Sequence, residues 1–501
     1  MSSSYATPGS VRVPPTTPVL DSVFGRLWPD PRTPGRPRLL AAALAVALLA
    51  ATIVPFREHG LAAFLVLLAV SGVVLTAGRR RFSTVRVGSG ILCLLLMSTV
   101  VIRDAGWIVA LCLLAAFAVG SAALTDGRSV NGLVASMVTV PVATLRGLPW
   151  LGRALSSGAQ PAAWWPAVRT IVLSSALVLL FGTLFAYADA LFARWVDAFV
   201  PDLTFTSLLV RGFVFAAVLG LTLAGAFVAV VPPDADRLSL PPAARLVRRY
   251  EWAIPVGLVL ATFAVFLIAQ LSVLFGGHDY LQRTTGVTYA EYVHQGFGQL
   301  TLATMLTLVV VAVATRRAPR QTAPDRAVLR VLLGLLCACT LVVVVSALYR
   351  MHLYQEAYGF TRLRLLVSVF ETWLGVVVVF VLAAGVALRG RWVPLASLLS
   401  GAAMLLGLAA LNPDGYIALN NIERFEETGK VDMQYLSGLS SDAVPALAQA
   451  GAVGLACADV ARMREREDWL EWNLGRSRAY DAREGSAGSE GAAEFLVFPC
   501  G

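Results

Sequence analysis

The stretch GLAAFLVLLAVSGVVLTAGRRR, residues 60–81, decides the fold, because a long apolar run ends abruptly in a block of arginines. A helix rises about 1.5 Å per residue, so a run of this length crosses most of a hydrocarbon core ~30 Å thick. Similar runs recur along the chain, which is 57% hydrophobic and 14% charged, with a mean hydropathy of +0.72. Soluble domains carry about 25% charged residues. The composition therefore predicts an all-α fold, a polytopic transmembrane helical bundle with a small helical C-terminal segment.

We predict about eleven membrane spans. The predicted spans are residues 39–56, 60–77, 87–102, 105–124, 168–188, 208–231, 252–275, 297–315, 327–349, 365–388 and 393–411. The segment 131–155 is interrupted by Pro141, Arg146 and Pro149. We therefore expect a helix that lies in the cytoplasmic interface there, and not a further span.

The distribution of arginine predicts the orientation, because short cytoplasmic loops collect Lys and Arg. Alternate loops hold arginine clusters, at 79–86, 237–249, 316–326 and 389–391, whereas most loops between them hold single arginines. The clusters predict a cytoplasmic N-terminus, and an odd number of spans then places the C-terminal segment outside the cytoplasm. Almost all basic residues are Arg, which is typical of a GC-rich bacterial genome, so we expect a multi-pass protein of the bacterial plasma membrane.

Four regions follow from these patterns. They are a disordered cytoplasmic tail (1–37), the transmembrane bundle (38–411), an extracytoplasmic helical segment (412–483) and a second disordered tail (484–501). The helical segment has clear start and stop signals. Asn412 is the expected N-cap of its first helix, Pro413 the first helical residue, Asp414 lies in the first turn, and Gly429 follows the end. Ser441 is the expected N-cap of a second helix.

The most polar connection is FGGHDYLQRTTGVTYAEYVHQGF, residues 275–297, which we expect to be a partly re-entrant extracytoplasmic loop. It contains His278, Asp279, Glu291 and His294. Glu291 and His294 form an E-x-x-H pair that could hold a metal, but di-iron bundles need a second such pair and further carboxylates. We therefore favour residues that order an interface over a metal site, with proton or substrate handling as the alternative.

A second polar segment follows the ninth span and contains Arg350, His352 and Glu356, which line a polar vestibule or form a surface layer of ion pairs. Glu371 lies about two turns into the tenth span. A carboxylate at that depth costs several kcal/mol unless it is paired or hydrated, so it is a functional candidate by default. A structural ion pair with Arg364 or Arg350 is the competing interpretation. The candidate functional residues are Glu371, His278, Asp279, Glu291, His294, Arg350, His352, Glu356, Asn412 and Asp414.

Several classes of function have no signature in this sequence. It contains no G-x-S-x-G elbow, P-loop, H-E-x-x-H or dinucleotide fingerprint, so we identify no catalytic motif and expect no cofactor. The cysteines have no metal-binding spacing, and four of them fall in predicted spans, where a thiol acts as a small hydrophobe. The basic residues are spread over short loops and form no compact module, which argues against nucleic acid as a partner.

Several polar strings together resemble a bacterial multi-pass family. They are LFAYADALFARWVDAF (184–199), the 275–297 loop, YRMHLYQEAYGFTRLR (349–364), NPDGYIALNNIERF (412–425) and WNLGRSRA (472–479). The sequence resembles domain of unknown function 4173, with its relative 4153, over roughly residues 165–480. The resemblance implies an integral membrane protein without an established activity. It also directs attention to segments 184–199, 275–297, 349–364 and 412–447, which we expect to pack together on one side, with the helical C-terminal segment docked over the loops.

Three functions compete at this point. The first is sensing, scaffolding or assembly in the envelope through the extracytoplasmic face, with the lipid bilayer and other envelope membrane proteins as partners. The second is secondary transport through Glu371 and the 275–297 loop, which requires a water-filled cavity that reaches Glu371. The third is a membrane-embedded transferase that acts on a lipid-linked substrate with His294 or Glu291 as base.

Overall fold

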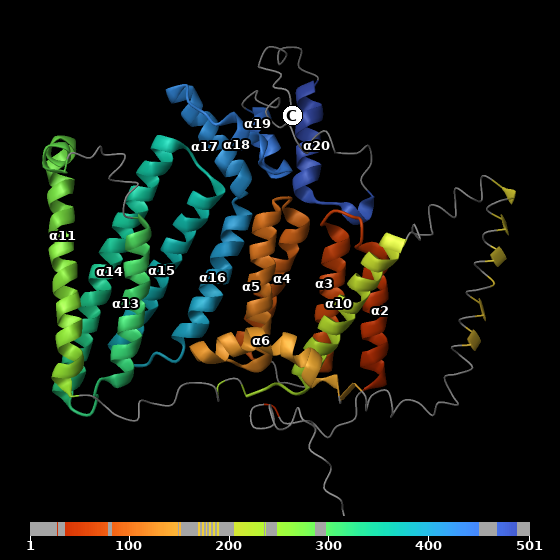
Figure 1. Ribbon diagram of the computed structural model, residues 1–501, viewed down its shortest axis with the longest axis horizontal. Coiled ribbons are helices and arrows are strands. Elements are labelled where there is room, and N and C mark those ends of the chain that lie inside the picture. Colours follow the sequence, from red (N-terminus) through yellow and green to blue (C-terminus); the bar gives the residue numbers. More distant parts are fainter. Residues whose placement is uncertain are drawn as a thin grey trace, which may run out of the picture.

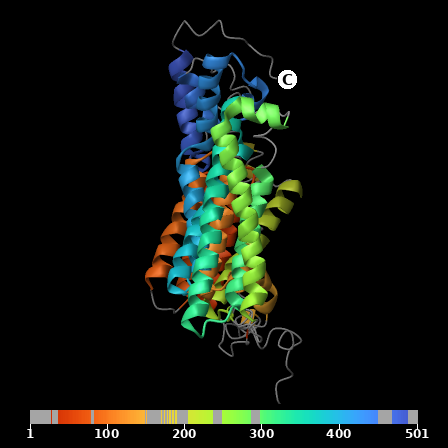
Figure 2. The same ribbon diagram turned by 90° about the vertical axis from the view of Figure 1, so that its left-hand side faces the viewer.

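A computed structural model describes residues 36–78, 83–148, 150–151, 205–234, 248–285, 297–449 and 468–487, with Trp28, Asp236 and scattered positions between 169 and 189. For residues 271–285 and 485–487 it describes the backbone alone. The regular elements among these residues are helices, and most of them stand side by side in a broad bundle (Figure 1). Turned by 90°, the bundle is much narrower (Figure 2). The expected all-α fold and helical bundle are confirmed.

The bundle contains eleven described helices. They are α2 (Pro37–Ile53), α3 (Leu61–Ala77), α4 (Thr84–Ile102), α5 (Gly106–Thr125), α6 (Val130–Arg146), α10 (Phe205–Val230), α11 (Arg249–Thr285), α13 (Phe297–Arg317), α14 (Ala323–Tyr358), α15 (Arg362–Ala387) and α16 (Val393–Ala410). Eight of these are long and apolar enough to cross a membrane, while α2, α3 and α6 are shorter apolar helices. Such helices fit a multi-pass membrane protein.

Ten of the predicted spans coincide with described helices, α6 being additional to them. The predicted span 168–188 falls where only scattered positions are described, and those between 169 and 188 are helical. In Figure 1 α6 lies at the lower end of the bundle and α10 begins at the upper end. Most residues of the predicted span 168–188 lie outside the described part of the chain.

The two ends of the bundle differ in charge. Figure 1 shows that α3, α13 and α15 end, and α4, α14 and α16 begin, at the lower end. We call it the arginine end, because Arg86, Arg316, Arg320 and Arg389 belong to the chain at this end. The helix α6 lies across it, at a steep angle to the other helices, so Val130–Arg146 does not run along the bundle as the spans do.

The opposite end carries the C-terminal helices, and we call this structure the cap. The cap consists of α17 (Pro413–Thr428), α18 (Met433–Ser437), η2 (Ser441–Ala443), α19 (Val444–Gln449), η5 (Trp469–Glu471) and α20 (Leu474–Ala487). Its own apolar core includes Ile417, Leu436 and Leu447, each at most 1% exposed. The predicted second helix of the C-terminal segment begins with η2, whose N-cap is Ser440 and not Ser441. The side chain of Ser440 forms no capping hydrogen bond, and Ser441 is the first residue of η2.

Two helices extend further than the hydropathy predicts. The expected loop 275–297 is wrong for its first part, because α11 continues to Thr285 through the Gly276–Gly277 pair. Figure 2 shows that its last turns bend away from the rest of the helix. Likewise α14 continues to Tyr358, so all of the segment 349–358 is helical. A drop in hydropathy marks where a helix leaves the hydrocarbon, whereas the helix itself ends only where the backbone changes conformation.

Candidate functional site at the junction of bundle and cap

The cap begins with a sharp turn at Asn412, directly after α16. Asn412 has a left-handed backbone (φ 55°), and its side chain accepts a hydrogen bond from the Gly415 N–H (3.3 Å). Its amide Nδ2 donates to the Asp442 carbonyl (2.8 Å), which links the start of α17 to η2. Gly429 ends α17 with φ 68°. The predicted start and stop signals of this helix are confirmed.

Asp414 lies in the first turn of α17 and is completely buried. Its Oδ1 accepts hydrogen bonds from Arg362 Nε (2.9 Å) and from Trp107 Nε1 (3.1 Å). Its Oδ2 accepts from Arg362 Nη2 and from the Ser440 N–H (2.9 Å). The pair with Arg362 is thus bidentate, the geometry in which arginine binds a carboxylate most specifically. One carboxylate of the cap therefore holds the start of α15, a side chain of α5 and the cap's own backbone.

The electrostatics of Asp414 follow from these contacts. Burial by itself raises its pKa, but the hydrogen bonds from Arg362 and Ser440 outweigh burial, so the pKa lies below the ordinary aspartate value. The neighbouring Tyr435 hydroxyl accepts a hydrogen bond from the Arg362 N–H (2.7 Å), and burial raises its pKa. Asp414 is accordingly ionised in the folded protein at neutral pH.

Asp442 forms the second buried anchor of the cap. Its Oδ2 accepts hydrogen bonds from the backbone N–H groups of Asp104 (2.7 Å) and Ala105 (2.8 Å), in the short turn between α4 and α5. Its Oδ1 lies 3.8 Å from Arg103 Nη1 and accepts no hydrogen bond. Burial raises the pKa of Asp442 above its ordinary value, although Ala105 and Arg103 act in the opposite direction. A Cβ at Gly475 would overlap this carboxylate, so glycine is needed there.

Arg103 and Asp104 connect the same turn to two further elements. Arg103 donates to the Ala409 carbonyl (2.6 Å) and the Ala410 carbonyl (2.8 Å), which caps the end of α16. Asp104 accepts from Arg476 Nη1 (2.8 Å) of α20 and from the Ser441 N–H (3.2 Å). The turn between α4 and α5 is therefore bonded to α16 and to two elements of the cap, η2 and α20.

Asn473 and Arg476 provide the contacts of α20. Asn473 is fully buried and donates to the carbonyls of Val100 (3.0 Å) and Arg103 (2.9 Å), while its Oδ1 accepts from the Gly475 N–H (2.9 Å). Asn473 thus forms hydrogen bonds with the backbone carbonyls at the end of α4 and with a backbone N–H in the first turn of α20. Arg476 is buried as well and donates to the His59 carbonyl (3.1 Å) in the loop between α2 and α3.

Asn421 and Arg424 connect α17 to the loop between α14 and α15. Asn421 Oδ1 accepts from the Phe360 N–H (2.9 Å) and its Nδ2 donates to the Phe360 carbonyl (2.8 Å). Arg424 donates to the carbonyls of Glu356 (2.9 Å) and Ala357 (2.6 Å), at the end of α14. The cap is therefore bonded to three loops of the bundle.

The predicted packing of polar segments can now be compared with these contacts. The segments 349–364 and 412–447 do lie together, as predicted. Most of 184–199 and part of 275–297 lie outside the described residues, and for the described part of the latter only the backbone is described. The loops that hold Arg103 and His59 were not expected to take part.

Glu371 lies on α15 and is completely buried. Neither of its carboxyl oxygens has a hydrogen-bond partner, so a hydrogen-bonded pair with Arg364 or Arg350, the competing interpretation of this residue, is not formed. The nearby hydroxyl groups of Thr301 and Thr304 on α13 donate instead to the carbonyls of Phe297 (3.2 Å) and Leu300 (3.1 Å). This is an unusual position for an acid, since buried polar groups are normally hydrogen-bonded.

The other candidate residues are more dispersed. His352 Nε2 lies 3.1 Å from Glu356 Oε1 on α14, with both side chains more than half exposed. Arg350 is buried. His278 and Asp279 belong to the backbone of α11, without described side chains, and Glu291 and His294 lie outside the described residues. Among the described residues no group of three or more His, Cys, Asp or Glu could hold a metal ion.

The sequence reasoning identified Asn412 and Asp414 but missed Arg103, Asp104, Asp442, Asn473 and Arg476. A signal for them was present. Arg103 and Asp104 make up nearly the whole turn between two predicted spans, where charges are exposed unless another segment covers them. Asn473 and Arg476 belong to the string WNLGRSRA, and Asp442 lies in the predicted second helix. The sequence shows that these residues are polar, but it does not show which residues they contact.

The chain matches the family model described as "Domain of unknown function (DUF4153)" over residues 90–450, well over half of its 501 residues. No curated protein and no solved structure matches it. The matching family is 4153, given above as a relative of 4173, and the match does not bear on 4173 or on a bacterial origin. The matched region contains Arg103, Asp414 and Asp442, and ends before Asn473. The chain belongs to the DUF4153 family.

Proposed function

We propose that this protein is a multi-pass scaffold of the bacterial plasma membrane, whose extracytoplasmic cap presents a fixed docking surface to other envelope membrane proteins. The observation that carries the proposal is the pair of buried carboxylates, Asp414 and Asp442, which come from the cap and are bound by donors from the bundle. Buried ion pairs add little net stability, and their best attested use is to fix one register or orientation. The anchors therefore hold the cap at a defined position above the helices.

The outer face of the cap supports a docking role. Tyr416 and Leu419 are exposed on α17 (42% and 48%), and Glu423, Glu426 and Glu427 are exposed on the same helix. Tyrosine is enriched at protein interfaces, and a cluster of acids favours a partner with a basic surface. The arginine clusters at the opposite end support a cap outside the cytoplasm.

Photo-crosslinking in cells tests this proposal. A photoreactive amino acid at Leu419 should yield a discrete crosslinked protein, whereas the same amino acid at Val313, exposed on the bundle helix α13, should not yield that species. Asp414→Asn should abolish the Leu419 adduct while the protein stays in the membrane, because the face is no longer held in position. Identical adducts from Leu419 and Val313 would contradict a docking role for the cap.

Transport is the second candidate, and Glu371 is the observation that favours it. An intramembrane acid without a hydrogen bond is costly, and such residues commonly mark ion or substrate paths. Glu371→Met should raise the melting temperature in detergent by about 1 °C, the shift expected for ~1 kcal/mol in a protein of 501 residues, since a costly group is removed. The same variant should fail to complement a deletion strain if Glu371 is functional. Full complementation would exclude transport through Glu371.

A further inference from the structure

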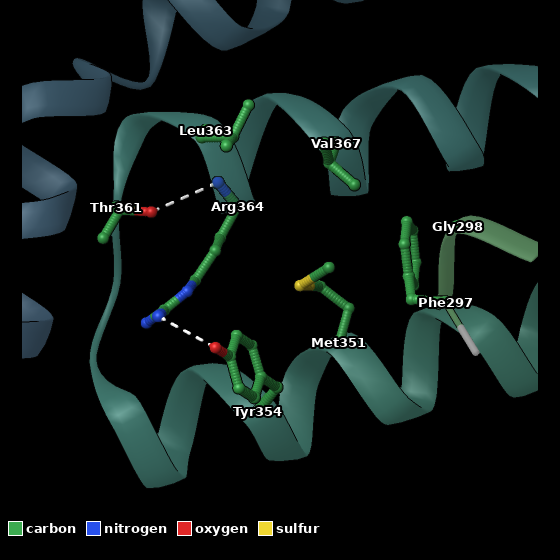
Figure 3. A pocket seen from close by; sticks show the side chains of 8 residues that line it. All are labelled: Phe297, Gly298, Met351, Tyr354, Thr361, Leu363, Arg364 and Val367. Carbon is green, nitrogen blue, oxygen red and sulfur yellow. Dashed lines mark hydrogen bonds between the residues drawn. The ribbon is translucent and has the colours of Figure 1, made fainter. Parts of the chain in front are cut away.

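A pocket opens at the cap end of the bundle, where the start of α13, the last turns of α14 and the first turns of α15 meet (Figure 3). Its volume is about 430 Å³. The residues that line it are Phe297, Gly298, Met351, Tyr354, Thr361, Leu363, Arg364 and Val367. Glu371 does not line it, so this pocket is separate from the buried acid.

The lining is divided into a polar side and an apolar side. Figure 3 shows Arg364, Thr361 and Tyr354 together on one side, and Phe297 and Val367 on the other. Phe297 begins α13, and Val367 lies on the second turn of α15. A ligand that satisfies both sides must be amphiphilic.

Arg364 supplies a positive charge that no described carboxylate neutralises. Its guanidinium lies 4.3 Å from the centre of the Tyr354 ring, and its Nη2 donates to the Tyr354 hydroxyl (3.3 Å). Its Nη1 donates to the carbonyls of Tyr358 (3.0 Å) and Gly359. These contacts hold the guanidinium in place without cancelling its charge, and the N-terminus of α15 adds the positive end of a helix dipole.

The position of the pocket matches the depth of lipid headgroups. Arg364 and Val367 lie in the first two turns of α15, and Met351 and Tyr354 in the last two turns of α14. Both helices are longer than a hydrocarbon core of ~30 Å requires, so these turns lie near its boundary. Leu363 is 71% exposed at this level, where the surface of the bundle meets lipid.

We propose that this pocket binds one anionic phospholipid from the leaflet at the cap end, with its phosphate on Arg364 and part of an acyl chain against Phe297, Met351 and Val367. A phosphate without a tail would leave the apolar side empty. A lipid without net charge would leave Arg364 unneutralised. Charge and shape together therefore select an anionic lipid.

Native mass spectrometry of the purified, delipidated full-length protein tests the proposal. Titration with phosphatidylglycerol should yield one retained lipid, whereas phosphatidylethanolamine at the same concentration should be retained at least about tenfold less, because its ammonium group, which phosphatidylglycerol lacks, is repelled by Arg364. Inorganic phosphate should not compete. Equal retention of the two lipids, or displacement by inorganic phosphate, would overturn the proposal.

Two variants with matched controls locate the site. Arg364→Gln should lower phosphatidylglycerol retention about tenfold or more, and Arg391→Gln at the opposite end should not. Val367→Trp should block the pocket while leaving Arg364 in place, and Val379→Trp, on an exposed part of the same helix, should not. Arg364→Gln also removes the hydrogen bonds to the Tyr358 and Gly359 carbonyls at the end of α14. If this variant fails to fold for that reason, Val367→Trp decides alone. Wild-type retention in a folded Val367→Trp variant would refute the site.

Discussion

Asp414 and Asp442 are both buried carboxylates, yet their surroundings shift their pKa values in opposite directions. Asp414 accepts a bidentate arginine and a backbone N–H, which together outweigh the effect of burial. Asp442 accepts two backbone N–H groups and lies 3.8 Å from an arginine, and burial dominates. The number and distance of the donors, and not the residue type, decide the sign.

Asp414→Asn should destabilise the docked cap by about 1–3 kcal/mol, because the buried side chain would lose its charge-assisted hydrogen bonds with Arg362, whose own side chain is 34% exposed. Limited proteolysis and thermal unfolding of the purified protein measure this loss. Glu423→Gln on the exposed face of α17 is the matched control and should change the free energy of unfolding by less than about 0.5 kcal/mol. Equal midpoints for both variants would show that the Arg362 pair does not hold the cap.

Asp442 should give the docked cap an unusual pH dependence. Its pKa is raised in the folded state, so its contribution to stability is fully present below the unfolded pKa of about 3.9 and is lost as pH rises through the folded pKa. Asp414, with a lowered pKa, contributes above the ordinary value and loses its contribution as pH falls through its folded pKa.

The two contributions can be separated by substitution. In Asp442→Asn, the loss of stability that the wild type shows on raising the pH above about 4 should disappear, while the loss at more acidic pH remains. Melting temperatures measured across this pH range check the prediction. An unchanged pH profile would mean that Asp442 does not titrate between the two states.

At the scale of elements, the short loop between α14 and α15 is shaped by the cap. Gly359 has φ 84°, a conformation that L-residues rarely adopt, and a Cβ there would lie 2.5 Å from Asn421 Oδ1. The helix α14 therefore ends where α17 contacts it. The position of this end depends on a contact between segments that are distant in the sequence.

Gly359→Ala should destabilise the protein by about 1–3 kcal/mol, because it combines backbone strain with a steric clash against Asn421. Gly385→Ala is the matched control, since a Cβ at Gly385, in the last turn of α15, meets nothing within 4 Å and alanine favours helix over glycine by up to about 1 kcal/mol. Thermal unfolding should place the two variants on opposite sides of the wild type. A neutral Gly359→Ala would show that the loop adapts without cost.

On the scale of the whole molecule, the cap and the arginine end, with Arg86, Arg316, Arg320 and Arg389, lie at opposite ends of one bundle. Asp104 and Asp442 are 338 residues apart in the sequence, and Arg103 and Ala409 are 306 apart. The cap thus joins the α2–α3, α4–α5 and α14–α15 loops into a single face. Any change that separates the cap should disturb all three loops together.

The orientation of this arrangement can be tested directly. In a Cys457→Ser/Cys500→Ser background, a cysteine at the exposed Thr428 of α17 should react with a membrane-impermeant maleimide in intact cells. A cysteine at Gln321, exposed at the arginine end, should react only after the membrane is permeabilised. The reverse pattern would place the cap in the cytoplasm and remove the basis of the proposed docking role.

The sequence by itself determined the features that depend on local chemistry. Apolar length located ten described helices, and the residues from Asn412 to Gly429 correctly predicted both ends of α17, because capping joins residues only a few positions apart. Local patterns failed where a helix continued beyond its apolar part, at α11 and α14. There hydropathy reports the surrounding medium and not the backbone conformation.

Only the tertiary structure decided which polar residues work together. Asp414 was a candidate from its place in a first helical turn, but its partners Arg362 and Trp107 are fixed by the packing of α15 and α5. Glu371 was a candidate from its depth, and the structure showed that no hydrogen bond compensates it. Hydrogen bonds between segments hundreds of residues apart depend on how the helices pack, and packing leaves no periodic signal in the sequence of either segment.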